Sequence, residues 1–175
     1  MSADINTEIT LKGTSEELAA FLKTIRAFSY TGSDSEDAEE EKCAYLEWVI
    51  IHVGEDSREL DDLSINDLKE LIGGGELSIT AEGPYGKFGE LSEVGLFEAL
   101  AEAAPTAWFS GSCSGFVTCA DVRIYALLEE RKLYLLECYL PDEAIPDSDE
   151  EYQAALAESG KETIYDPIRK EYIDG

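Results

Sequence analysis

An amphipathic helix between two strands limits the possible folds of this chain more than any other feature. The segment Thr14-Ser15-Glu16-Glu17 has the form of a capping box, in which Thr14 or Ser15 caps a helix and Glu17 reaches back. Apolar residues then recur at helical spacing along one stripe, which consists of Leu18, Phe21, Leu22, Ile25 and Phe28. Residues 6–13 alternate in polarity before this helix, and residues 43–53 after it are rich in aromatic and β-branched side chains. The pattern predicts a strand, a helix with one buried face, and a second strand.

The remaining periodicities predict further strand–helix units and then a run of strands. Helices are expected over 64–72, which a run of three glycines ends, and over 92–104, which Pro105 ends. Strands are expected over 76–83, 106–113, 115–127 and 132–140. The links GSCSG (111–115) and LEERK (128–132) are short enough to be hairpin turns.

This order of elements predicts an α+β fold. We expect a core domain over residues 1–140, with two or three helices covering one face of a mostly antiparallel sheet, in a ferredoxin-like arrangement or a variant of it. Residues 141–175 differ in character and contain an acidic linker, a short helix over 150–159 and a hairpin that turns at Asp166-Pro167. We expect this segment to be a C-terminal appendage docked on the core.

Charge limits the partners of the chain. There are 39 Asp and Glu residues against 13 Lys and Arg, which gives a net charge of −26 in 175 residues. Such a chain repels nucleic acid and anionic membranes, so we expect no direct binding to either. No apolar run reaches the roughly 18 residues that a membrane-spanning helix needs, and the first ten residues lack a signal-peptide pattern. We therefore expect a cytoplasmic protein whose partner is positively charged.

The acidic residues concentrate in three connecting segments, 33–41, 54–62 and 141–151. The candidate partner-binding residues are Asp34, Glu36, Asp37, Glu39, Glu40, Glu41, Glu55, Asp56, Asp61, Asp62, Asp142, Glu143, Asp147, Asp149, Glu150 and Glu151. One interpretation is that these are solvated loops. The other is that they replace the phosphates of a nucleic acid, because duplex DNA carries one charge per about 1.7 Å and carboxylates can pair with the Lys and Arg of a groove. We expect the segment 33–41 to contribute most.

The segment Gly111-Ser112-Cys113-Ser114-Gly115 matches G-x-C-x-G, a nucleophile elbow with cysteine in place of serine. An elbow joins a strand to a helix, but the residues that follow are β-branched and aromatic. The only histidine, His52, lies 61 residues before Cys113. A tight turn between two strands accounts for the segment, so we expect no enzyme activity. An enzyme that uses Cys113 as its nucleophile remains an alternative. Otherwise we expect the four cysteines to be reduced core residues, namely Cys43, Cys113, Cys119 and Cys138.

Metal and cofactor motifs are weak in this chain. Residues 147–158 imitate a calcium loop, with Asp147, Asp149, Glu151 and Glu158 at positions one, three, five and twelve, but Tyr152 stands where the loop requires glycine. There is no C-x-x-C pair, and neither glycine-rich segment (73–75 or 83–89) opens a helix with G-K-S/T. We therefore expect no metal site and no cofactor.

The charge, the size and the acidic loops resemble those of the anti-CRISPR and anti-restriction inhibitors of phages and mobile elements, several of which act as DNA mimics. The segment LSITAEGPYGKFGELSEVGLFEALAEAAPTAWFSG (77–111) is similar to small ferredoxin-like proteins of plasmids and conjugative elements. Together these resemblances imply a mobile-element protein of the bacterial cytoplasm, and they assign no catalytic residue.

The sequence therefore predicts a non-enzymatic acidic inhibitor that acts by protein–protein interaction. Its expected partner is a positively charged nucleic-acid-processing defence protein, such as a CRISPR effector or a restriction enzyme, whose access to nucleic acid it blocks by charge mimicry. The alternatives are an acidic adaptor of a mobile element without mimicry, and the small enzyme that uses Cys113. The target, the oligomeric state and the spatial relation of the three acidic segments stay open at this point.

Overall fold

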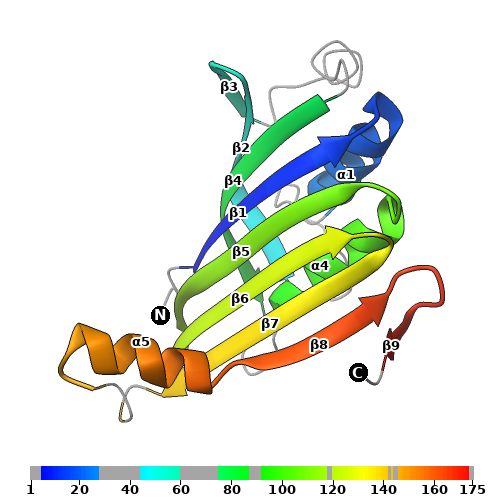
Figure 1. The fold of residues 1–175 in the computed structure, drawn as a ribbon. Helices are drawn as coiled ribbons and strands as arrows, with labels where there is room; N and C mark the ends of the chain where they lie inside the picture. The colour runs from blue at the N-terminus through cyan, green and yellow to red at the C-terminus, as the bar shows by residue number, and fades with distance from the viewer. Residues whose placement is uncertain are drawn as a thin grey trace.

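The computed structural model describes residues 5–27, 44–59, 75–86, 92–117, 120–141, 143 and 146–173, and Figure 1 shows their arrangement. The strands are β1 (Ile5–Gly13), β2 (Ala44–Val53), β3 (Asp56–Glu59), β4 (Gly75–Gly86), β5 (Trp108–Val117), β6 (Ala120–Glu129), β7 (Lys132–Pro141), β8 (Lys161–Asp166) and β9 (Glu171–Ile173). The helices are α1 (Ser15–Ala27), α4 (Ser92–Ala103) and α5 (Asp149–Glu158). The nine strands form one sheet in the order β3-β2-β4-β1-β5-β6-β7-β8-β9.

The predicted α+β class with an antiparallel sheet is confirmed. The four strands β2-β4-β1-β5, with α1 after β1 and α4 after β4, have the connectivity and order of a ferredoxin-like unit. The sheet is larger than that unit, because β3 extends it at one edge and β6 to β9 extend it at the other. Every adjacent pair of strands is antiparallel. The predicted C-terminal hairpin is β8 and β9, which continue the same sheet.

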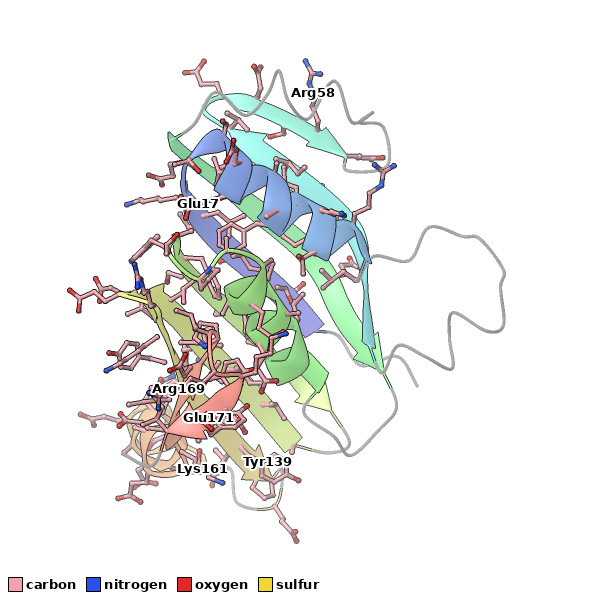
Figure 2. All side chains as sticks on the ribbon, turned by 90° about the vertical axis from the view of Figure 1, so that its right-hand side faces the viewer. Glu17, Arg58, Tyr139, Lys161, Arg169 and Glu171 are labelled. Carbon is pink, nitrogen blue, oxygen red and sulfur yellow. The ribbon has the colours of Figure 1, made fainter. Side chains whose placement is uncertain are left out.

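Helices α1 and α4 pack side by side on one face of the sheet and bury the main core, as Figures 1 and 2 show. Three phenylalanines join the layers. Phe109 of β5 contacts Phe21 of α1 edge-on, with ring centroids 5.7 Å apart, and stacks on Phe97 of α4 at 6.1 Å. All three side chains are fully buried. The predicted apolar stripe of α1 is buried as far as Ile25, and Phe28 lies outside the described residues.

The predicted capping box begins α1. The Thr14 backbone N–H donates to Glu17 Oε1 at 3.0 Å, and the Glu17 N–H donates to Thr14 Oγ1 at 3.2 Å. The hydrogen bond from the Thr14 backbone lowers the pKa of Glu17 below its ordinary value, and burial opposes this shift. The Thr106 hydroxyl also donates to Glu17 Oε2 at 2.9 Å, so the cap ties α1 to the segment that enters β5.

Two of the predicted turns are confirmed. Glu130 (φ 51°) and Arg131 (φ 65°) form the two-residue turn between β6 and β7, in which both residues have the positive φ of a hairpin turn. Between β8 and β9, Asp166 Oδ1 accepts hydrogen bonds from the N–H groups of Ile168 and Arg169. The predicted helices over 92–104 and 150–159 correspond to α4 and α5, whereas the one predicted over 64–72 lies outside the described residues.

The prediction that GSCSG is a turn is wrong, because β5 runs straight through it and pairs with β1 on one side and β6 on the other. Gly111 is needed for packing, not for a turn. A Cβ atom there would lie 2.8 Å from Phe97 Cε1 and 3.2 Å from Ile9 Cγ1. The glycine therefore lets α4 approach the sheet. Strand β3 was also missed, since it lies in the acidic segment 54–62, which shows no alternation of polarity.

Replacing Gly111 with alanine is expected to lower the free energy of unfolding by about 1–3 kcal/mol. The new methyl group would press on the Phe97 ring, which is fully buried and stacked on Phe109, so relief requires α4 to move. Urea denaturation measures the effect, with Ser112→Ala, on the opposite face of β5, as the matched control. Equal unfolding midpoints for Gly111→Ala and the native chain would contradict the close approach of α4 to β5.

Candidate interaction surfaces

The face of the sheet opposite α1 and α4, here called the open face, carries side chains in rows that cross the strands. The register places one row along Glu59, Ile50, Thr80, Glu8, Ser112, Tyr125, Leu136 and Glu162. The next row consists of Ser57, His52, Ser78, Thr10, Ser110, Leu127, Tyr134, Ile164 and Ile173. Both rows are mainly polar from β3 to β5 and mainly apolar from β6 onward. The open face is thus divided into a polar half and an apolar half.

The apolar half contains a groove of about 860 Å³ that crosses β5 to β9. Its walls include Ser110, Tyr125, Leu127, Tyr134, Leu136 and Ile164. Tyr125 is 43% exposed and Tyr134 is 39% exposed, although both belong to strands whose opposite face is buried core. Contiguous exposed apolar surface is uncommon on a folded domain, and where it occurs it often marks an interaction site.

Sequence reasoning missed this groove. The segments 124–128 and 133–136 are apolar on both faces, which is typical of strands buried on both sides. The repeated tyrosines were a usable signal, because tyrosine suits a surface that is partly exposed and partly in contact. No local pattern shows that helices cover only one of the two faces.

Helix α5 covers one end of the open face. Leu156 is buried against Cys138 and Leu140 of β7, and Tyr152 packs at the margin of this small cluster. The Ser148 side chain caps the helix by accepting from the Glu151 N–H at 3.3 Å. At the other end the Ser159 hydroxyl accepts a hydrogen bond from the Tyr139 backbone N–H at 3.2 Å. The helix is therefore fixed to β7 by a cap and a few apolar contacts.

A partly buried ion pair lies beneath α5. Arg123 Nη2 is 3.8 Å from Asp121 Oδ2, and the Arg123 guanidinium lies 5.9 Å from the Tyr152 ring. Burial raises the pKa of Asp121, and the charge of Arg123 opposes that shift. Burial also raises the pKa of the Cys138 thiol, which keeps this cysteine protonated and poorly nucleophilic. The contact of Arg123 with Tyr152 and the packing of Cys138 against Leu156 help to hold α5 on the sheet.

The acidic residues of 141–151 surround the start of α5, except that Asp142 lies outside the described residues. Glu143, Asp147, Asp149, Glu150 and Glu151 are all exposed. The last three occupy the first turn of the helix, where the helix dipole favours negative charge. Among the described residues, no Lys or Arg forms an ion pair with any of these five carboxylates. We call these five residues the acidic cap.

The other candidate residues lie elsewhere or outside the described part of the chain. Glu55 and Asp56 are exposed at the turn from β2 to β3. Asp61 and Asp62, and the whole set Asp34, Glu36, Asp37, Glu39, Glu40 and Glu41, fall outside the described residues. Six strand spacings of about 4.8 Å separate β3 from β7, which is about 29 Å. Figure 1 shows β3 and α5 at opposite ends of the sheet, so Glu55 and Asp56 do not join the acidic cap in one patch.

Cys113 lies in the middle of β5, not at a strand-to-helix elbow. Its side chain points to the core face, is 2% exposed, and its Sγ lies 3.1 Å from Thr7 Oγ1. His52, the other residue of the enzyme hypothesis, is on the open face, where its two ring nitrogens lie 2.8 Å from Ser57 Oγ and 3.0 Å from Thr80 Oγ1. The two residues therefore lie on opposite faces of the sheet. This arrangement does not provide a nucleophile and a base in contact.

The calcium-like spacing over 147–158 falls on α5. A helix directs carboxylates outward around its axis and cannot fold them around one ion as a calcium loop does. Within the described ranges, no cluster of three or more His, Cys, Asp or Glu side chains has the arrangement of a metal site. In the same ranges no helix has the length and apolar character that crossing a membrane requires.

A carboxylate–tyrosine cluster joins α4 to the last two strands. The Tyr165 hydroxyl donates to Glu102, and the Tyr172 hydroxyl donates to Glu98. Burial and these carboxylates raise the pKa of both tyrosines, so the hydroxyls stay protonated as donors. Figure 2 shows β9 on the helix-covered side of the molecule, where these contacts hold it. The cluster fixes β8 and β9, which form one wall of the groove.

Comparison with protein-family models, with curated proteins and with solved structures finds no match to this chain.

Proposed function

We propose that this chain is a non-enzymatic binding protein that inhibits a positively charged nucleic-acid-processing protein, such as a CRISPR effector or a restriction enzyme. In this proposal the chain occupies the surface on which the partner binds nucleic acid. The observation that carries the proposal is the acidic cap, which presents five exposed carboxylates around one helix end without internal ion pairs among the described residues. The net charge of −26 supports a partner of opposite charge.

The charge spacing of the acidic cap is comparable to that of duplex DNA. Asp149, Glu150 and Glu151 are consecutive in α5, and residues of an α-helix rise by about 1.5 Å each. Duplex DNA carries one negative charge per about 1.7 Å of its axis. Successive side chains of an α-helix point about 100° apart, so a groove lined with Lys and Arg that surrounds this helix end can meet carboxylates at a comparable density per length of axis.

Electrostatics of this kind act mainly on the rate of association and on specificity. An exposed ion pair contributes only about 0.2–1 kcal/mol, so several pairs are needed for a useful affinity. A strongly negative surface also steers a positive partner and raises the association rate, and this effect weakens with salt. The proposal therefore implies steep salt dependence and competition by nucleic acid. The acidic-adaptor alternative, which the exposed apolar groove favours, implies binding that is indifferent to both.

The test begins with capture of partners from bacterial lysate on the immobilised full chain, followed by elution with either salt or a 20-base-pair duplex. We expect a nucleic-acid enzyme that both agents release, and whose nucleic-acid binding the free chain then inhibits. A captured partner that neither salt nor duplex releases would contradict charge mimicry and would favour the adaptor.

Neutralising the acidic cap with Asp147→Asn, Asp149→Asn and Glu150→Gln is expected to weaken binding of that partner by about tenfold or more, since three ion pairs are lost. The matched control is Glu55→Gln, Asp56→Asn and Glu59→Gln, which changes the net charge equally at the opposite end of the sheet. Acids in the first turn each stabilise a helix by about 0.3–1 kcal/mol, so their removal could weaken α5. Circular dichroism of the variant therefore checks that α5 is retained. Equal weakening by both triple variants would mean that only net charge matters, and would contradict a site at α5.

A further inference from the structure

We propose that the groove on the open face receives an arginine side chain carried by an extended segment of the partner. This inference rests on the proposed function, because it assumes a positively charged protein partner, and it adds a second and chemically different contact to the acidic cap. The guanidinium would stack on Tyr125 and Tyr134 and would pair with Glu162.

The floor of the groove provides two phenol rings near one carboxylate. Tyr125 faces Leu136 across β6 and β7, and Leu127 faces Tyr134, so the two tyrosines are diagonal neighbours on one face. In an antiparallel pair such neighbours are about 7–8 Å apart, within reach of one flat group placed between them. Glu162 of β8 faces Leu136 on the same face, and it lines the groove. Glu162 therefore lies in the same row as Tyr125 and is a diagonal neighbour of Tyr134.

The surroundings of the groove favour a cation as its occupant. Glu162 is exposed, and no ion pair joins it to a Lys or Arg within the described part of the chain. Its neighbour Lys161 points to the other face, where it lies opposite Glu137. Helix α5 packs near Leu136 at one end of the groove, and the opposite end carries both signs of charge, with Glu129 and Asp166 near Lys132 and with Glu171 in an ion pair with Arg169. A positive group placed over the tyrosines therefore meets the carboxylate of Glu162 in the floor, in a chain whose net charge is −26.

Arginine fits this floor better than lysine does. Its guanidinium is planar, stacks on aromatic faces, and can donate two parallel hydrogen bonds to one carboxylate. It is also more weakly hydrated than an ammonium group, so less hydration is lost when it contacts Leu127 and Leu136. The groove of about 860 Å³ exceeds one side chain, which leaves room for the adjoining backbone of an extended segment.

The experiment uses the full chain labelled with ¹⁵N and a blocked peptide, acetyl-Gly-Ser-Arg-Ser-Gly-amide, as the probe. Its control peptide has citrulline, the neutral isostere, in place of arginine. We expect the arginine peptide to shift the amide resonances of 110–112, 125–127, 134–136 and 162–164. The citrulline peptide is expected to bind at least about fivefold more weakly, since it lacks the charge that both the rings and Glu162 attract.

Two pairs of variants separate the groove from the rest of the surface. Tyr134→Ala is expected to weaken binding of the arginine peptide by about threefold to fivefold. Tyr139→Ala should not, because Tyr139 is an exposed tyrosine of the same strand that faces the other side of the sheet (Figure 2). Glu162→Gln is expected to weaken binding by about twofold to fivefold. Glu16→Gln, which removes one charge from an exposed position of α1 on the helix-covered side, should leave binding of the peptide unchanged.

Three results would overturn the inference. Shifts confined to α5 and the β2–β3 turn would place the cation on the acidic surface alone and leave the proposed function standing. Equal affinity for the arginine and citrulline peptides would make the groove an apolar site. Groove resonances that broaden with protein concentration before peptide is added would identify a second copy of this chain as the occupant. Conversely, if the groove variants weaken peptide binding while the acidic-cap variant leaves partner binding unchanged, this inference holds and the proposed function fails.

Discussion

Replacing Phe109 with alanine is expected to lower the free energy of unfolding by about 3–5 kcal/mol, the cost of truncating a buried phenylalanine. Phe109 is fully buried and is the residue of β5 that contacts an aromatic ring from each covering helix, Phe21 of α1 and Phe97 of α4. The truncation leaves a cavity between three elements, and α4 cannot fill it without breaking its contact with Gly111. Since a domain of this size has a total stability of about 5–15 kcal/mol, much of it would be lost.

Urea denaturation followed by tryptophan fluorescence measures this loss. Phe109→Leu, which keeps most of the volume but not the ring contacts, is expected to cost clearly less than the alanine variant. Tyr139→Ala, which truncates an exposed aromatic residue of β7, should change stability by less than about 0.5 kcal/mol. A loss below about 1 kcal/mol in Phe109→Ala would mean that the two helices do not share the packing centre assigned to Phe109.

Replacing Leu156 with alanine is expected to release α5 while the sheet stays folded. Leu156 is the buried residue through which α5 contacts Cys138 and Leu140, and the loss of a buried leucine side chain costs about 2–5 kcal/mol. A helix of ten residues is too short to persist alone in water, where about 12–15 residues are needed. The helix should therefore unfold locally, and the acidic cap should lose its fixed position.

Hydrogen exchange distinguishes local release from global unfolding. Amide protection is expected to fall over 149–158 and to persist in β5 and β6, and binding of the charged partner should weaken although no charge has changed. Gln153→Ala, an exposed substitution in the same helix, is the control and should preserve protection. Equal loss of protection in β6 and α5 would show that α5 unfolds together with the main core.

Most elements of this fold could be predicted from local patterns. Helix α1 was located by its capping box and its apolar stripe, because both depend on residues within one or two turns. Strand β1 followed from alternation, and the β6–β7 hairpin from a short polar link between two apolar runs. Each of these signals comes from residues that are close together in the chain, so it can be recognised without knowledge of the tertiary structure.

The segment 111–115 shows where local signals are ambiguous. Glycine and serine are typical of turns, yet the reason for Gly111 is the Phe97 ring of a helix that packs on it. Nothing in the five residues distinguishes a glycine required for a turn from one required for a close approach. The segment is a strand because β5 pairs with β1, and several of the paired residues are more than a hundred positions apart in the chain.

For the candidate surfaces, the sequence alone identified the acidic segments and led to the proposal of a positively charged partner. It also identified the helix on which part of that charge is presented. Only the tertiary structure decided that β3 and α5 lie at opposite ends of the sheet, and that one face of β5 to β9 stays open around Tyr125 and Tyr134. The physical reason is that charge and helix propensity belong to residues and their near neighbours. Strand order and the coverage of a sheet face depend instead on contacts between segments far apart in the chain.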